Sequence, residues 1–123
     1  MNDRATIKTV SGFVEQQSDA QNNRFVFAYT ITIENISDKP FQLLSRHWVI
    51  QDANRKIEEV YGDGVVGEQP VIKPGQSYTY SSGAVLETEM GTMEGRYFMQ
   101  SENEDEFEVA IPKFVLTVPR ILH

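Results

Sequence analysis

The sequence has no cysteine and only two histidines, His47 and His123, in 123 residues. Without cysteine, a disulfide framework and a thiolate metal site are both excluded. Chains without disulfides are typical of reducing compartments, so we expect a cytoplasmic protein. The two histidines lack the spacing of zinc ligands on one helix or hairpin. We therefore expect no cofactor and no specific metal site.

Positive charge and long apolar runs are also scarce. The chain has 11 Lys and Arg residues against 18 Asp and Glu, a net charge of −7. Nucleic-acid affinity depends largely on basic side chains that displace counterions, so nucleic-acid binding is not expected. No apolar run approaches the roughly 18 residues of a membrane helix, and the N-terminus lacks the apolar core of a signal peptide, so no membrane association is expected. Attraction to divalent cations or to a basic protein surface stays open.

Alternating apolar and polar residues are the dominant pattern in the sequence. Residues 25–34 show it clearly: Phe25, Phe27, Tyr29, Ile31 and Ile33 share one parity. A period of two predicts a half-buried strand with these five side chains facing the core. Asn35, Ser37, Asp38 and Pro40 then end the strand.

The next run, residues 41–52, is apolar on both parities. One face would carry Leu44, Trp48 and Ile50, and the other would carry Phe41, Leu43 and Val49. We expect Trp48 in the core, with His47 on the opposite face. We expect further strands over residues 6–16, 56–61, 69–72, 77–83, 95–102, 106–111 and 114–118, with exposed loops at 17–24 and 102–106.

The spacing of these segments predicts the fold class. Strand-like runs recur about every dozen residues with turn residues between them, and long helical periodicity is absent. We therefore expect an all-β, immunoglobulin-like or fibronectin-III-like sandwich of two antiparallel sheets. The length predicts a single domain over residues 1–123.

One short motif invites a nucleotide-binding interpretation. Gly62, Gly64 and Gly67 form G-x-G-x-x-G in the stretch GDGVVGEQP. In dinucleotide folds a helix follows this motif, and its N-terminal amides bind the phosphates. Here EQPVIKPG follows, which opposes a helix, and Glu68 would repel a phosphate. We expect the glycines to serve loop geometry, while a backbone anion site and a protein-binding loop stay open.

Three other features of the sequence bear on possible chemistry. Arg46 and Trp48 are residue types enriched in interface hot spots, and His47 is the only internal imidazole. No serine lies in a G-x-S-x-G elbow, so no catalytic site is predicted. An acidic cluster could bind a hard cation, although such runs are usually solvated loops. It comprises Glu102, Glu104, Asp105, Glu106 and Glu108.

The order of these motifs resembles the ApaG family. The matching stretches are SRHWVIQD, VYGDGVVGEQPVIKPGQSYTYSSG, GTMEGRYFM and IPKFVLTVP, and the resemblance covers roughly Ile7 to Pro119. Arg55 replaces a turn glycine common in the family, and Glu89 replaces a common proline. The resemblance implies a fibronectin-III-type sandwich, and it implies links to cobalt resistance, magnesium efflux and a neighbouring diadenosine tetraphosphate hydrolase gene. Similar domains occur in an F-box protein and in a polymerase-delta-interacting protein.

Together these observations favour a non-catalytic binding or adaptor module with a protein partner. The alternative is a small-ligand protein that binds pyrophosphate, a dinucleotide or a divalent cation at the Gly62–Gly67 loop. The candidate surface for either function comprises Arg46, His47, Gly62, Asp63, Gly64, Gly67 and Glu68.

Overall fold

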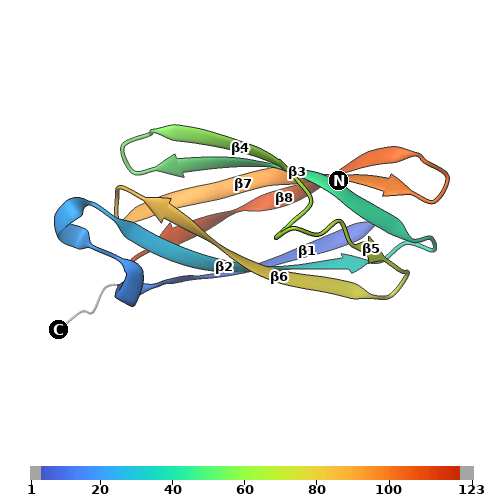
Figure 1. Ribbon diagram of the computed structural model, residues 1–123, viewed down its shortest axis with the longest axis horizontal. Coiled ribbons are helices and arrows are strands. Elements are labelled where there is room, and N and C mark those ends of the chain that lie inside the picture. The colour runs from blue at the N-terminus through green and yellow to red at the C-terminus, as the bar shows by residue number, and fades with distance from the viewer. Residues whose placement is uncertain (1–3, 120–123) are drawn as a thin grey trace.

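The structure, a computed structural model, describes residues 4–119 (Figure 1). Its strands are β1 (Ala5–Phe13), β2 (Phe25–Asn35), β3 (Phe41–Asp52), β4 (Ile57–Asp63), β5 (Val71–Ile72), β6 (Ser77–Leu86), β7 (Met90–Ser101) and β8 (Glu106–Thr117). Two 3₁₀ helices, η1 (Glu15–Gln17) and η2 (Ala20–Asn22), lie between β1 and β2. In this described part of the chain, no helix is long and apolar enough to cross a membrane.

The strands form two facing sheets. The smaller sheet has the order β1-β2-β6, and the larger has the order β4-β3-β7-β8 with β5 paired to the start of β3. Each pairing is antiparallel. The predicted all-β sandwich of two antiparallel sheets is therefore confirmed.

Strand β2 follows its sequence pattern closely. Phe27, Ile31 and Ile33 are fully buried between the sheets. On the outer face the hydroxyls of Thr30 and Ser81 are 2.7 Å apart, linking β2 to β6. Alternation thus supplies the core on one side and polar cross-strand pairs on the other, as a half-buried sheet requires.

Strand β3 departs from the predicted faces. Phe41, Leu43 and Trp48 all lie in the core, although simple alternation places Trp48 on the opposite face from the other two. The register with β7 shifts between Leu43 and Ser45, so Leu44 is an extra residue in a β-bulge. A bulge reverses the side-chain parity beyond it. Trp48 is buried as predicted, with its ring 5.5 Å from that of Tyr29.

The end of the chain was predicted as two strands, 106–111 and 114–118, and this is wrong. Strand β8 is continuous, and its register with β7 shifts where Pro112 and Lys113 face Glu94. Proline has no N–H to donate, so it is tolerated at a bulge on an edge strand. Strand β7 also begins five residues before the predicted start at residue 95. The segments 17–24 and 102–106 connect strands as expected. The first also contains η2 and the last residue of η1, and the second ends at Glu106, where β8 begins.

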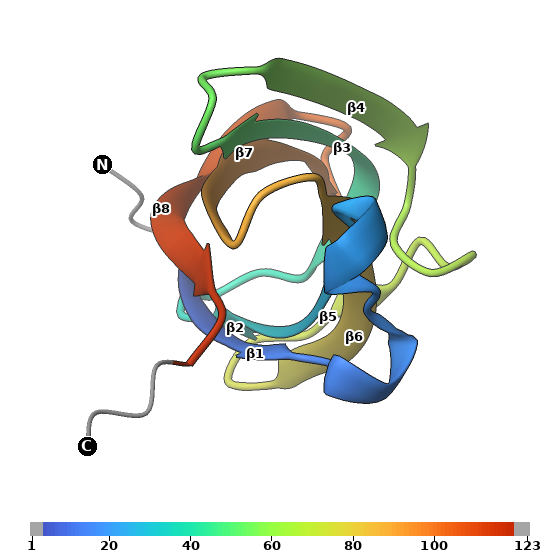
Figure 2. The ribbon, with the colours of Figure 1, turned by 90° about the vertical axis from the view of Figure 1, so that its left-hand side faces the viewer.

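The two long sides of the sandwich differ. On one side β1 approaches β8, and the Ser11 hydroxyl donates to the Val115 carbonyl at 3.1 Å. On the other side β4 and β6 are the outer strands, and the chain between β4 and β5 crosses between the sheets (Figure 2). This crossing segment contains most of the G-x-G-x-x-G motif.

Candidate functional site

The glycine motif forms a tight hairpin in the chain between β4 and β5, two strands that both pair with β3. The N–H of Val65 donates to the Glu68 carbonyl at 2.8 Å, and the Glu68 N–H donates back to Val65 at 3.0 Å. Val66 and Gly67 between them have φ of 48° and 79°. Two consecutive residues with positive φ define a type I′ turn, the preferred turn of two-residue hairpins.

Gly64 is required by both backbone angle and space. Its φ is +61°, and a Cβ at this position would lie 2.2 Å from the Glu68 carbonyl oxygen. Its N–H donates to the carbonyl of Leu44 at 2.8 Å, and the Gln69 side chain donates to the same oxygen at 2.9 Å. The bulge residue of β3 therefore anchors both ends of the hairpin.

This geometry differs from the phosphate cradle of a dinucleotide fold, in which the glycine motif precedes a helix. The chain after Gly67 continues without a helix into β5, as predicted from the sequence. The amides of Gly64, Val65 and Glu68 already donate to carbonyl groups. The Glu68 carboxylate accepts a hydrogen bond from the Tyr78 hydroxyl at 2.9 Å. The motif therefore serves loop geometry in this fold.

Arg46 reaches under the hairpin from the inner face of β3. Its Nη1 donates to the carbonyls of Asp63 at 3.1 Å and Gly64 at 2.7 Å. A Cβ on Gly62 would lie 2.7 Å from three guanidinium atoms, so the planar group passes directly over this glycine. Among residues 4–119, Arg46 forms no ion pair with a carboxylate.

A cavity of about 260 Å³ lies beside this guanidinium, between the sheets. The larger sheet and its hairpin contribute Arg46, Asp63, Val65, Val66 and Gly67, and the smaller sheet contributes Tyr29, Tyr80 and Ser82. Sequence reasoning identified Arg46, Asp63 and Gly67 but missed the residues of the smaller sheet. Tyr29 lies on the apolar parity of its strand, so the pattern assigned it only to the core, and Tyr80 was placed in a predicted strand without a face.

The two tyrosines of this cavity have raised pKa values. Burial raises the pKa of Tyr29, while a hydrogen bond with Ser82 and the charge of Arg46 oppose this rise. Burial also raises the pKa of Tyr80 and of Tyr97 behind it, and the two hydroxyls are hydrogen-bonded to each other. All three therefore stay protonated at neutral pH and can donate hydrogen bonds.

His47 lies apart from this cavity. It faces the outside of the larger sheet, where its ring stacks on Tyr61 with centroids 4.1 Å apart. Its Nε2 lies 2.9 Å from a Glu59 oxygen, and Arg96 donates to Nδ1 at 3.4 Å. A single patch containing Arg46, His47 and the glycine loop is therefore not formed.

The acidic residues do not assemble into a metal site. No group of three or more histidine or carboxylate side chains within residues 4–119 is placed to bind a metal ion. In the acidic cluster, Asp105 pairs with Arg4 at 3.5 Å and Glu108 pairs with Arg96 at 3.0 Å.

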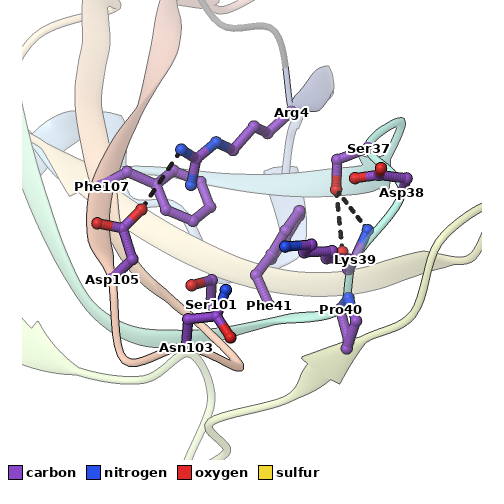
Figure 3. Close-up of a pocket in the computed structure, with 10 residues that line it drawn as sticks. All are labelled: Arg4, Ser37, Asp38, Lys39, Pro40, Phe41, Ser101, Asn103, Asp105 and Phe107. Carbon is purple, nitrogen blue, oxygen red and sulfur yellow. Dashed lines mark hydrogen bonds and ion pairs between the residues drawn. The ribbon is translucent and has the colours of Figure 1, made fainter.

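A second hollow, of about 310 Å³, lies at the end of the sandwich where the β2–β3 and β7–β8 loops meet (Figure 3). Here the Arg4 guanidinium lies 4.2 Å from the centre of the Phe107 ring and pairs with Asp105. The arginine of this hollow thus has a carboxylate partner, whereas Arg46 has none among the described residues. The cavity beside Arg46 is the better candidate site.

Comparison with known proteins identifies the family. The profile of the ApaG domain matches residues 15–101. The Protein ApaG of Dechloromonas aromatica is 51% identical over 98% of this chain and 94% of its own length. That of Escherichia coli O139:H28 is 49% identical over 98% and 96%. This chain belongs to the ApaG domain family.

Solved structures agree with this assignment. A crystal structure described as that of an ApaA protein from Bordetella pertussis matches with a TM-score of 0.92 and 44% identity, over 95% of each chain. A protein from Archaeoglobus fulgidus matches with a TM-score of 0.54 at 12% identity, which shows a related fold only. The Bordetella pertussis protein therefore shares the sandwich along nearly the whole chain.

Proposed function

We propose that this ApaG domain is a non-catalytic, cytoplasmic binding module that recognises a protein partner with the tip of the 65–68 hairpin. The proposal rests on the exposure and the backbone conformation of Val66. Its side chain is 63% exposed, and its φ is 48°. Positive φ is rare for a β-branched residue and costs about 1–2 kcal/mol, and asparagine is the favoured residue at this turn position.

Valine is therefore an unfavourable residue at position 66, because its backbone φ is positive and its apolar side chain is exposed to water. Its presence there supports a role in binding. The hairpin is also held rigidly, because Val65 is fully buried and Leu44 and Arg46 bind the loop backbone. A rigid scaffold that presents an exposed apolar residue loses little conformational entropy on binding. These properties fit a protein surface better than a soluble small ligand.

The proposal of no catalysis is supported by the distribution of reactive groups. His47 is the only imidazole within residues 4–119, and it is covered by Tyr61 on the far face from the cavity. We propose that the family's link to cobalt and magnesium depends on the protein partner and not on a metal site on this chain. Titration with Mg²⁺ and Co²⁺ should then leave the amide shifts of residues 62–69 unchanged.

A capture experiment tests the proposal. The full chain is immobilised as wild type, as Val66→Asn, and as Val85→Thr, a control at another exposed valine. A protein retained by wild type and by the control, but lost with Val66→Asn, is purified and its affinity for the three chains is measured. We expect at least about tenfold weaker binding to Val66→Asn, equivalent to one apolar hot spot. A partner bound equally by all three would exclude the hairpin tip.

A further inference from the structure

We propose that the cavity beside Arg46 binds a carboxylate group. The guanidinium provides the positive charge, and the hydroxyls of Tyr29, Tyr80 and Ser82 form the facing wall. The cavity shares Val66 and Gly67 with the hairpin tip proposed above, but the carboxylate is tested with small molecules alone, so either proposal can fail without the other.

Arg46 is a cation with no carboxylate within ion-pair distance among residues 4–119. A guanidinium has five N–H donors, and both hydrogen bonds of Arg46 use Nη1. The three donors on Nε and Nη2 make no hydrogen bond to any residue between 4 and 119. Two parallel N–H groups of a fixed guanidinium match the two oxygens of a carboxylate.

The guanidinium of Arg46 is also preorganised. Two backbone carbonyls fix Nη1, and the plane of the group passes over Gly62, where a side chain would displace it. Holding a long side chain in one position before binding lowers the entropic cost of association. The sequence position of Gly62, directly across from Arg46 in the β3–β4 ladder, provides this close approach.

The residues around the cavity and its volume limit the charge and size of the ligand. Asp63 is among the residues that line the cavity, and a negative charge on this residue disfavours a dianion such as hydrogen phosphate more than a monoanion. The net charge of −7 acts at longer range and is screened beyond about 8 Å at physiological ionic strength. The volume of about 260 Å³ accommodates a small carboxylate or the end of a peptide.

Amide and arginine Nε–H NMR shifts of the labelled full chain provide the test. Sodium acetate, sodium phosphate, triglycine and triglycine amide are titrated at constant ionic strength, with chloride as the reference. We expect saturable shifts at Arg46 Nε–H and at residues 64–67 with acetate, with a dissociation constant on the order of 1–10 mM. Triglycine amide, which lacks the carboxylate, should cause none.

Two comparisons identify the source of the carboxylate. Tighter binding of triglycine than of acetate would identify a peptide C-terminus, while equal or weaker binding would identify a free small carboxylate. Tighter binding of phosphate than of either would overturn the carboxylate assignment, as would equal shifts with triglycine amide. Acetate shifts that do not saturate would show that Arg46 only holds the loop.

Three variants test whether acetate binding depends on Arg46. Arg46→Gln should weaken acetate binding at least about tenfold, the loss of one charge-assisted hydrogen bond. Lys113→Gln removes the same charge from an exposed site on β8 and should leave the affinity unchanged. Gly62→Ala keeps the charge but occupies the guanidinium position, and it should also weaken binding. Unchanged affinity in both Arg46→Gln and Gly62→Ala would refute the proposal.

Discussion

The glycine motif allows a sharp test because its positions differ in their surroundings. Gly64 and Gly67 both have positive φ, at 61° and 79°. A Cβ on Gly67 meets nothing within 4 Å, whereas a Cβ on Gly64 would lie 2.2 Å from the Glu68 carbonyl oxygen. Alanine at Gly67 should therefore introduce only backbone strain, while alanine at Gly64 should also force the hairpin open.

The expected free energies follow from these contacts. Gly67→Ala should lower the free energy of unfolding by about 1 kcal/mol, the usual cost of alanine at positive φ. Gly64→Ala adds the loss of the two hydrogen bonds between Val65 and Glu68, at about 1 kcal/mol each. We expect a total of about 3 kcal/mol, and thus a difference of about 2 kcal/mol between the two variants.

Urea unfolding followed by tryptophan fluorescence measures this difference. Trp48 is the only tryptophan and is 2% exposed, so its emission reports the exposure of the core. With a urea m-value of about 1–3 kcal/mol/M, the two midpoints should differ by about 1 M. Equal midpoints for Gly64→Ala and Gly67→Ala would refute the argument that backbone overlap at Glu68 makes Gly64 indispensable.

Three further predictions concern stability. Burial raises the pKa of Tyr80 and of Tyr97 above 10.0, so their contribution is fully present below pH 10 and is lost as pH rises toward the folded-state pKa. The free energy of unfolding measured with urea should fall above pH 10, by up to about 1.4 kcal/mol per pH unit for each tyrosine, and Tyr97→Phe should reduce this slope; equal slopes would contradict the assignment. Val66→Asn should raise the melting temperature by a few degrees, because asparagine tolerates the φ of 48°; a lower value would show that Val66 is not strained. Arg55 has a φ of 67° in the β3–β4 turn, so Arg55→Gly should stabilise the chain by up to about 1 kcal/mol in urea unfolding, and destabilisation would mean that its side chain outweighs the strain.

The sequence alone determined the fold class and much of the strand layout. Alternation in residues 25–34 fixed which side chains of β2 face the core, because strand geometry places every second residue on the same face. The proline and β-branched residues after Gly67 excluded a helix there. Positive φ at Gly64 and Gly67 agrees with the expectation that these glycines serve loop geometry.

Tertiary structure decided the bulge at Leu44 and the composition of the candidate site. No local pattern shows that an extra residue brings Trp48 to the same face as Leu43, because the bulge depends on pairing with β7 some fifty residues later. Likewise, Arg46 lines the same cavity as Tyr29 and Tyr80 only because the two sheets pack face to face. A period of two assigns a residue to a face, but strand order and sheet packing determine what that face meets.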